Sequence, residues 1–465
     1  MQPNILFLFA DDERFDTIHA LGNEEIITPN LDALVQRGTS FTQCHIPSGT
    51  SAAVCMPSRA MLNTGRQLFS LQGEGRKIPA DHALLGETLR AAGYDTFGTG
   101  KWHNGKESYY RSFSHGDEIF FGGMDDHWAV PCHHFDPTGK YDQRRYKVHN
   151  CFHSNERSTY ISDHVGEKHS TELFAEATRK FIETRSELDK PFYAYVSFMA
   201  PHDPRTMPER FKAMYDVNEI TLPENFMSYH GVEYDNAQVR DELLAPYPRT
   251  KEDTKSQILE YYAMITHIDD EIGKVIQALK DHGTYDNTII IYAADNGLAL
   301  GQHGLFGKQN HYDHSIRVPF VIAGPKIPQE AKRDTYIYLL DIFPTICEML
   351  DIAIPETVEG RSFWPSVEDQ GVVCREDLYF AYTDKIRSVK DRRYKLMEHV
   401  YEGVLTTQLF DLNEDPLEIS NLAQNPAYAS KVDALRSKMI SYHEEWHEEA
   451  HEMGAHYWRQ YRELV

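Results

Sequence analysis

The chain has 465 residues, of which 41% are hydrophobic and 25% are charged, enough apolar material for one large core or two. With no low-complexity tract, this composition excludes a largely disordered protein. The 47 basic and 71 acidic residues give a net charge of −24, which argues against nucleic acid or an anionic membrane as the main partner. No apolar run approaches the ~20 residues that a membrane span requires.

The N-terminus does not resemble a secretion signal. No basic residue precedes Arg14, and an apolar stretch begins almost at once. We therefore expect a cytoplasmic location for the chain as written, and a periplasmic or secreted one if a leader has been removed. The six cysteines form no CxxC pair, so we expect free thiols. They are Cys44, Cys55, Cys132, Cys151, Cys347 and Cys374.

Strand-like and helix-like segments alternate along most of the chain. Apolar runs predict strands over residues 5–10, 94–100, 192–198, 288–294 and 318–323. Helical spacing predicts helices over residues 28–38, 81–93, 170–188 and 254–282. Such alternation is typical of an α/β protein with a largely parallel sheet.

The pattern changes near residue 376. Short strands are predicted over 378–382, 394–398 and 408–412 with no helices between them, and a charged helix follows over about 431–453. We therefore predict an N-terminal catalytic domain over residues 1–375. Residues 376–465 are predicted to form a C-terminal subdomain, a small antiparallel sheet with a helix.

Four of the predicted strands are followed by reactive side chains. These are Asp11, Asp12, Lys101, His103, His202, Asp295 and Asn296. Any one group is also typical of a turn or a helix cap. Ligands of open α/β sheets bind outside the carboxyl ends of the strands, however, so the four groups together predict one site.

The residue types in this predicted site favour a particular chemistry. Carboxylate and amide oxygens are hard ligands, suited to Ca²⁺ or Mg²⁺ rather than zinc. The cations that would balance a bound anion are Lys101, His103, His202 and Lys308. A divalent ion beside lysines and histidines suits the transfer of a tetrahedral, multiply charged oxyanion.

The most specific motif runs from Cys55 to Gly65. In structural terms it is a buried thiol before a proline-started helix, whose first N–H groups would attract an anion. A Cys-x5-Arg phosphatase is excluded, because Arg59 stands two residues too early.

This stretch, Cys55-Met-Pro-Ser-Arg59 with Thr64-Gly65, resembles the C-x-P-S-R…T-G signature of the sulfatase family. Further motifs of that family follow in order along nearly the whole chain. They are Asp11-Asp12, Gly100-Lys-Trp-His103, Pro201-His202, Asp295-Asn296-Gly297, Gly301-Gln-His-Gly-Leu-Phe-Gly-Lys308, Arg317-Val-Pro319 and Leu409-Phe-Asp-Leu-Asn-Glu-Asp-Pro416 with Asn421-Leu422. The resemblance implies an alkaline phosphatase-like fold: a large mixed, mostly parallel sheet between helices, with a smaller C-terminal antiparallel sheet plus helix.

The resemblance also implies a modified nucleophile and a cation. A formylglycine-generating maturation enzyme would convert Cys55 to formylglycine (3-oxoalanine), whose hydrate attacks sulfur. Ca²⁺, with Mg²⁺ as the alternative, would be held by Asp11, Asp12, Asp295, Asn296 and residue 55. The other implied roles are Arg59 holding the formylglycine, Lys101 and Lys308 contacting sulfate, His202 protonating the departing alcohol, His103 removing the proton of the second hydroxyl, and His303 lining the site.

These implications lead us to predict a sulfatase that acts on a sulfate monoester of a small alcohol or carbohydrate. A net charge of −24 should repel a long sulfated polymer, so one sulfate group is favoured. The histidine-rich segment 115–169 is predicted to form the outer pocket rather than a zinc site. One alternative is a phosphonate monoester or phosphodiester hydrolase with the same nucleophile; another is a non-catalytic anion-binding protein with unconverted Cys55. The sequence gives no prediction of the oligomeric state.

Overall fold

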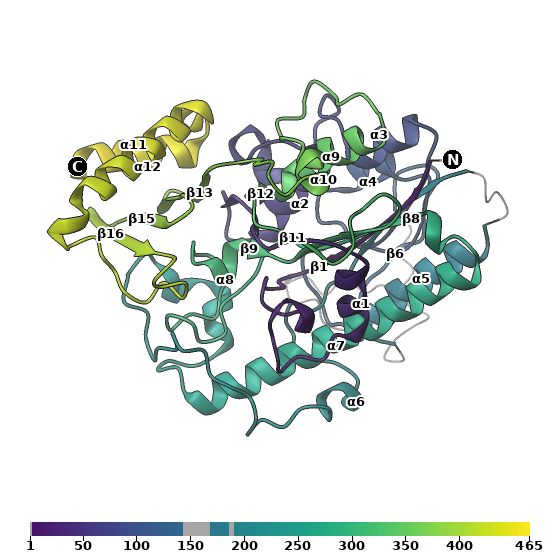
Figure 1. Cartoon of the computed structure of the whole chain (residues 1–465), viewed down its shortest axis with the longest axis horizontal. Helices are drawn as coiled ribbons and strands as arrows, with labels where there is room; N and C mark the ends of the chain where they lie inside the picture. The colour runs from purple at the N-terminus through teal and green to yellow at the C-terminus, as the bar shows by residue number, and fades with distance from the viewer. Residues whose placement is uncertain (1, 143–167, 186–189) are drawn as a thin grey trace.

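The computed structural model describes residues 2–142, 168–185 and 190–465. An eight-stranded mixed sheet lies at its centre, with helices on both faces (Figure 1). From edge to edge the strands are β11 (Ala331–Arg333), β2 (Gly38–Phe41), β10 (Phe320–Ala323), β8 (Thr288–Ala294), β1 (Asn4–Ala10), β7 (Phe192–Ser197), β5 (Asp95–Lys101) and β6 (His115–Phe120). Strands β8, β1, β7, β5 and β6 run parallel, whereas β10 is antiparallel to both of its neighbours. The predicted mixed, mostly parallel sheet is confirmed.

Helices bury both faces of this sheet. One face is covered by α1 (Pro29–Arg37), α5 (Ser170–Glu183) and α7 (Lys251–Asp281), and the other by α2 (Cys55–Thr64), α3 (Leu85–Ala91), α4 (Lys106–Ser112), α9 (Ile342–Met349) and α10 (Trp364–Glu368) (Figure 1). Two short helices, α6 (Glu209–Lys212) and α8 (Asp313–Ile316), complete this part of the chain. With both faces covered, β8 consists almost wholly of buried apolar residues, as central parallel strands do. None of the helices in the described part of the chain is both long and apolar enough to cross a bilayer.

The prediction of one strand over residues 318–323 was wrong in one respect. The chain forms two strands there, β9 (Arg317–Val318) and β10, and they lie in different sheets. Pro319 separates them, because proline has no N–H to donate to a ladder. β9 belongs to a three-stranded sheet with β3 (Cys44–His45) and β12 (Ile337–Tyr338).

The C-terminal sheet has five strands. They are β16 (Val404–Asp411), β15 (Tyr394–Tyr401), β14 (Ile386–Lys390), β13 (Leu378–Tyr382) and β4 (Ser48–Gly49). The first four are antiparallel, as predicted, although β14 was not among the predicted strands. The edge strand β4 comes from the N-terminal region and pairs parallel with β13. A division of the chain at residue 376 stays a prediction.

The single helix predicted over residues 431–453 was wrong. The chain forms α11 (Ala429–Glu445) and α12 (Glu452–Leu464), separated by a break. His447 takes a left-handed conformation (φ 49°), and this turn buries Glu448. The Glu448 carboxylate accepts hydrogen bonds from Arg387 Nε and Trp458 Nε1, both at 2.9 Å. Two helices joined by a turn therefore satisfy a buried ion pair, which explains the break.

Candidate active site

Four neighbouring parallel strands bring their carboxyl ends to one edge of the central sheet. Strand β1 leads into Asp11 and Asp12, β5 ends at Lys101, β7 leads to His202, and β8 leads into Asp295. Strands β1 and β8 pair with each other along their whole length, with Ala10 opposite Ala294. The predicted convergence of these groups at one edge is therefore present in the fold.

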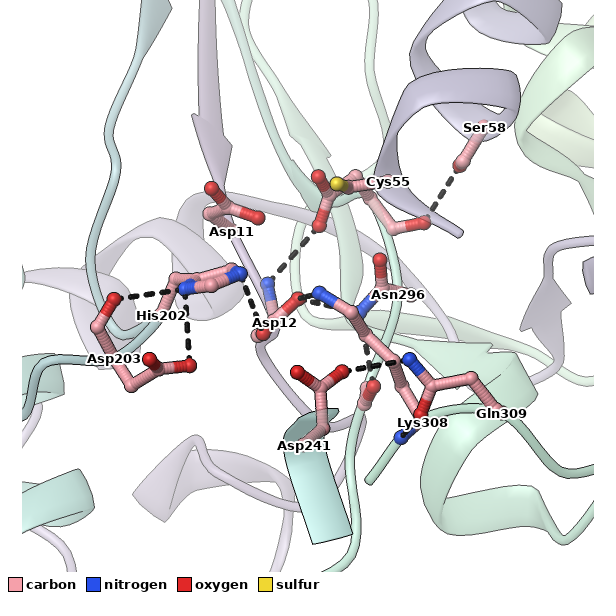
Figure 2. A network of polar contacts seen from close by, with 12 residues as sticks. Asp11, Asp12, Cys55, Ser58, His202, Asp203, Asp241, Asn296, Lys308 and Gln309 are labelled. Atoms are coloured by element: carbon pink, nitrogen blue, oxygen red, sulfur yellow. Dashed lines mark hydrogen bonds and ion pairs between the residues drawn. The ribbon is translucent and has the colours of Figure 1, made fainter. Parts of the chain in front are cut away.

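The acidic side chains meet in a buried cluster (Figure 2). The backbone N–H of Asp12 donates to Asp295 Oδ1 at 3.0 Å, and Asn296 Nδ2 donates to Asp12 Oδ1 at 2.7 Å. Burial, together with the charge of Asp295, raises the pKa of Asp11 well above its usual range. Three carboxylates packed this closely away from water require a positive charge among them.

Two oxygen atoms of this cluster are available to a cation. Asp11 Oδ1 and Asn296 Oδ1 are buried and have no hydrogen-bond partner among the described residues. Ligand atoms of Asp11, Asp295 and Cys55 lie within 4.8 Å of one another, and so do those of Asp11, Asp12 and His202. A set of hard oxygen donors with unsatisfied buried oxygens fits Ca²⁺ or Mg²⁺.

Two buried lysines reach the same carboxylates. Lys101 Nζ lies 2.5 Å from Asp11 Oδ2, and Lys308 Nζ lies 2.5 Å from Asp12 Oδ1. Burial alone would lower the pKa of Lys308, but Asp12 and neighbouring acidic groups outweigh it and hold the pKa well above its usual range. Lys308 therefore carries its charge into the site.

Cys55 is the first residue of α2 and points toward this cluster (Figure 2). It is 3% exposed, and its Sγ lies 3.6 Å from Nδ1 of His103. Burial raises the pKa of the Cys55 thiol, so the unmodified side chain is a poor nucleophile near neutral pH. The unmodified residue 55 is therefore a neutral thiol rather than a thiolate.

Arg59 lies one turn further along α2 and is fully buried behind the carboxylates. Its Nε donates to Asp295 Oδ2 at 2.8 Å, and Nη1 donates to Ser197 Oγ at 2.5 Å. Nη2 is 3.7 Å from Asp11 Oδ2. The guanidinium therefore fixes the carboxylates of β1 and β8 relative to α2.

Two histidines face the cluster from the segments that follow the neighbouring strands β5 and β7. His202 Nε2 lies 3.5 Å from Asp12 Oδ2, while Nδ1 is 2.9 Å from the backbone oxygen of Asp203. Burial and the charges of Lys308 and Lys101 lower the pKa of His202 well below its usual range. The same causes, burial first, lower the pKa of His103.

His303 does not join the cluster. Its ring stacks on Tyr312 with centroids 3.8 Å apart, and its Nε2 is 3.2 Å from Nδ2 of Asn225. It is not among the residues that line the cavity containing Cys55. The geometry gives no support to the predicted lining role.

Four polar residues at this site were missed by the sequence analysis (Figure 2 labels three of them). Asp203 accepts two hydrogen bonds from Arg240, both at 2.7 Å. Gln309 Nε2 donates to Asp241 Oδ2 at 2.6 Å. Asp203 and Gln309 directly follow predicted residues, which is a usable signal, whereas Arg240 and Asp241 lie in a 3₁₀ segment with no motif.

The cluster opens into a cavity of about 750 Å³. Its lining includes Cys55, His103, His202, Asp241, Lys308 and Gln309, together with Arg76, Lys77, Arg240, Phe121 and Met124. Basic residues outnumber acidic ones here, in a protein of net charge −24. The cavity thus offers local attraction to an anion that the surface as a whole repels. In the described part of the chain a second cavity, of about 770 Å³, is lined by none of the predicted site residues.

The predicted outer-pocket segment is only partly described. Residues 143–167 of the segment 115–169 lie outside the described residues. The described part, which includes Phe121 and Met124, contributes to the cavity wall.

Comparison with known proteins identifies relatives along the whole chain. A model of the sulfatase family matches residues 3–352, and a model of the C-terminal part of N-sulphoglucosamine sulphohydrolase matches residues 301–445. An arylsulfatase from Clostridium perfringens is 28% identical over 95% of this chain and 94% of its own. An N-acetylglucosamine-6-O-sulfatase from Bacteroides thetaiotaomicron is 24% identical over 93% of this chain and 85% of its own.

Solved structures share the fold. One, of a protein in complex with its substrate D-glucosamine-2-N,6-O-disulfate, has a TM-score of 0.80 and 21% identity, covering 98% of this chain and 99% of its own. The phosphonate monoester hydrolase of Agrobacterium radiobacter has a TM-score of 0.72 and 23% identity, covering 96% of each chain.

Proposed function

Because the chain belongs to the sulfatase family, whose members hydrolyse sulfate esters, we propose that it hydrolyses a sulfate monoester of a small alcohol or carbohydrate. We further propose that Cys55 acts as formylglycine and that a divalent cation completes the site. The observation that carries the proposal is that Cys55, buried acidic oxygens and two buried lysines meet in one cluster, from which Cys55 and Lys308 reach the wall of a cavity.

The proposed cofactors supply what the unmodified chain lacks. Ca²⁺ or Mg²⁺, held by Asp11, Asp12, Asp295 and Asn296, would draw charge from a sulfate oxygen and from the attacking hydroxyl. The aldehyde hydrate of formylglycine would supply that hydroxyl, and its second hydroxyl allows sulfate to leave by elimination rather than by attack of water.

The side chains of the chain itself position the substrate and move protons. Lys101 and Lys308, now paired with carboxylates, would turn to the sulfate oxygens. His202, at the rim of the cluster, would give a proton to the alcohol oxygen as the S–O bond breaks. His103, 3.6 Å from Cys55 Sγ, would take the proton of the second hydroxyl when the S–O bond to residue 55 breaks.

The cavity supports a substrate that carries one sulfate group on a compact body. Its volume of about 750 Å³ lies within the usual range for small-molecule pockets. A relative named N-acetylglucosamine-6-O-sulfatase and a structural neighbour in complex with a glucosamine disulfate favour a saccharide. Our proposal is therefore a mono- or disaccharide sulfate or a small alcohol sulfate, rather than a long polymer.

A comparison of matched esters tests the proposed reaction. We expect kcat/KM for a sulfated mono- or disaccharide, or for choline sulfate, to exceed that for the matched phosphonate monoester or phosphate diester by at least about 100-fold, because a sulfate monoester offers three terminal oxygens to the cation and the two lysines, whereas these phosphorus esters, which carry the same charge, offer two. The measurement is a screen of sulfated mono- and disaccharides, aryl sulfates, choline sulfate and their phosphorus analogues, with enzyme of known conversion at Cys55. The opposite ratio would establish the alternative, a phosphonate monoester or phosphodiester hydrolase.

Removal of the cation should destabilise the protein as well as inactivate it. After dialysis against a chelator, Ca²⁺ at 100 times its Kd should add about 2.7 kcal/mol to the free energy of unfolding, because it binds only the folded carboxylate cluster. The variant Asp295→Asn should lose this response, while Asp241→Asn, a buried cavity carboxylate outside the predicted ligand set, should keep it. Calorimetric melting with and without Ca²⁺ is the measurement. An equal response in Asp295→Asn and in the unsubstituted enzyme would refute the ligand assignment.

A further inference from the structure

A second group of metal-ligand side chains lies between α5 and α7, which pack side by side (Figure 1). Glu172 is in the first turn of α5, while His267 and Glu271 stand four residues apart on α7. This spacing places His267 and Glu271 on one face of the helix. Ligand atoms of all three residues lie within 4.8 Å of one another. None of the three lines the cavity that contains Cys55.

His267 has a buried imidazole with no hydrogen bond. It is 0% exposed, and neither ring nitrogen has a hydrogen-bond partner among the described residues. Its Nε2 is 3.8 Å from Glu172 Oε1, beyond hydrogen-bond range. A buried polar group without a partner is costly, which points to a ligand that satisfies it.

The orientation of the His267 ring is fixed by its neighbours. Phe211 stacks on one side with centroids 4.5 Å apart, and the His169 ring lies 4.9 Å away. Burial and the nearby charges of Arg210 and Lys274 lower the pKa of His267 to about 3, so the imidazole is neutral. A neutral, immobilised imidazole aimed at two carboxylates is the state in which histidine binds metals.

The two carboxylates are balanced by cations that are free to move. Lys274 Nζ lies 2.5 Å from Glu271 Oε1, and Arg210 Nη2 lies 3.4 Å from Glu172 Oε1. The Lys274 and Arg210 side chains are 41% and 58% exposed. Lys274 is also 3.0 Å from Asp270, so it stays paired when it leaves Glu271. A divalent ion can therefore replace both cations without leaving a buried charge unpaired.

We infer that Glu172, His267 and Glu271 form a binding site for a divalent transition-metal ion of the zinc class, separate from the proposed catalytic cation. One imidazole and two carboxylates match a zinc site with three protein ligands and a water, whereas Ca²⁺ takes oxygen ligands alone. The ion joins the first turn of α5 to α7. It sits beside His169, whose ring stacks on His127, and His127 Nε2 donates to the backbone oxygen of His202 at 3.0 Å. Through His169 and His127, the bound ion thus stabilises the position of the loop that contains His202.

Zinc binding by matched variants tests the site. The enzyme is freed of metal with a chelator, saturated with Ca²⁺ to fill the proposed catalytic site, and titrated with Zn²⁺. Bound zinc per chain is measured by mass spectrometry of the metal after gel filtration, and the melting temperature is measured in parallel. The test variants are His267→Phe, which keeps a flat ring against Phe211, and Glu271→Gln, which keeps the shape of the side chain.

We expect the unsubstituted enzyme to bind one zinc ion per chain more than either variant, with affinity at this site at least about 100-fold lower in both variants. Both variants should also lose the zinc-dependent rise in melting temperature. Lys274→Met should bind zinc more tightly, since it removes a competing cation.

The control is Glu176→Gln, which removes an exposed carboxylate one turn further along α5 and should bind zinc like the unsubstituted enzyme. Equal zinc content and equal melting shifts in the unsubstituted enzyme, His267→Phe and Glu271→Gln would overturn the assignment. His267 would then be a buried member of an aromatic stack and nothing more.

Discussion

Replacement of Cys55 by alanine is expected to lower kcat/KM for any sulfate ester by at least about 10⁴-fold, the scale seen when a nucleophile is removed. Cys55→Ser should be nearly as inactive, because a serine ester of sulfate has no second hydroxyl and cannot eliminate sulfate. The fold should be kept, since residue 55 starts a helix whose other members are buried against the sheet. Steady-state kinetics and thermal melting of both variants are the measurements.

The matched control is Cys374→Ser, which should leave kcat/KM unchanged. Cys374 is a half-buried free thiol that follows α10 in the sequence. Mass spectrometry of the peptide that contains residue 55 completes the experiment. An unmodified thiol in fully active enzyme from its native host would refute the formylglycine proposal. Unmodified thiol together with sulfate binding and no turnover would instead establish a non-catalytic anion-binding protein.

The second large effect concerns the leaving group. His202→Ala should lower kcat/KM for an alkyl or sugar sulfate by about 10²–10⁴-fold, because an alkoxide leaves poorly unless it is protonated. An activated aryl sulfate, whose phenolate leaves readily, should lose less than about 10-fold. The measurement is a plot of log kcat/KM against the pKa of the leaving alcohol for the variant and the unsubstituted enzyme, with the steeper slope expected in the variant.

Two further variants test the assignment of His202 as the proton donor. Asp203→Asn should steepen the same plot to a smaller degree, because Asp203 Oδ1 lies 3.2 Å from His202 Nδ1 and is itself held by Arg240. His19→Ala replaces an exposed histidine paired with Asp32 and should leave the plot unchanged. Parallel plots for His202→Ala and the unsubstituted enzyme would show that another group protonates the alcohol.

The sequence was most informative where a strand is buried on both faces. Residues 289–294 and 5–10 are apolar throughout, and they form β8 and β1 together with one polar residue at the start of each strand. The predicted bounds, 288–294 and 5–10, lie within one residue of those observed. The polar residues that follow such strands converge because neighbouring parallel strands end at one edge. The order of the strands, and the antiparallel placement of β10, depend on contacts far apart in sequence and leave no local signal.

Buried charges account for much of what the sequence did not reveal. Strand β14 was not predicted, and it carries two cations, Arg387 and Lys390, which the structure buries against the distant residues Glu448 and Asp313. Asp241 was missed because its contact with Gln309 joins residues 68 positions apart and leaves no local signal. His303 fits a family motif by spacing, but its ring packs on Tyr312 instead.

The pairing of β4 with β13 bears on the stage of synthesis at which the proposed conversion of Cys55 would be easiest. Residue 55 is 3% exposed in the finished fold, and β4, which ends six residues before it, pairs with Ala381 and Tyr382 of β13. A ribosome working at about 5–20 residues per second needs roughly 15 to 65 s to travel from codon 55 to codon 381. Until then β4 has no β13 to pair with, so the segment that leads to residue 55 cannot reach its final packing. If Cys55 is converted, we expect a maturation enzyme that acts during synthesis to meet a more open cysteine than one that acts after release.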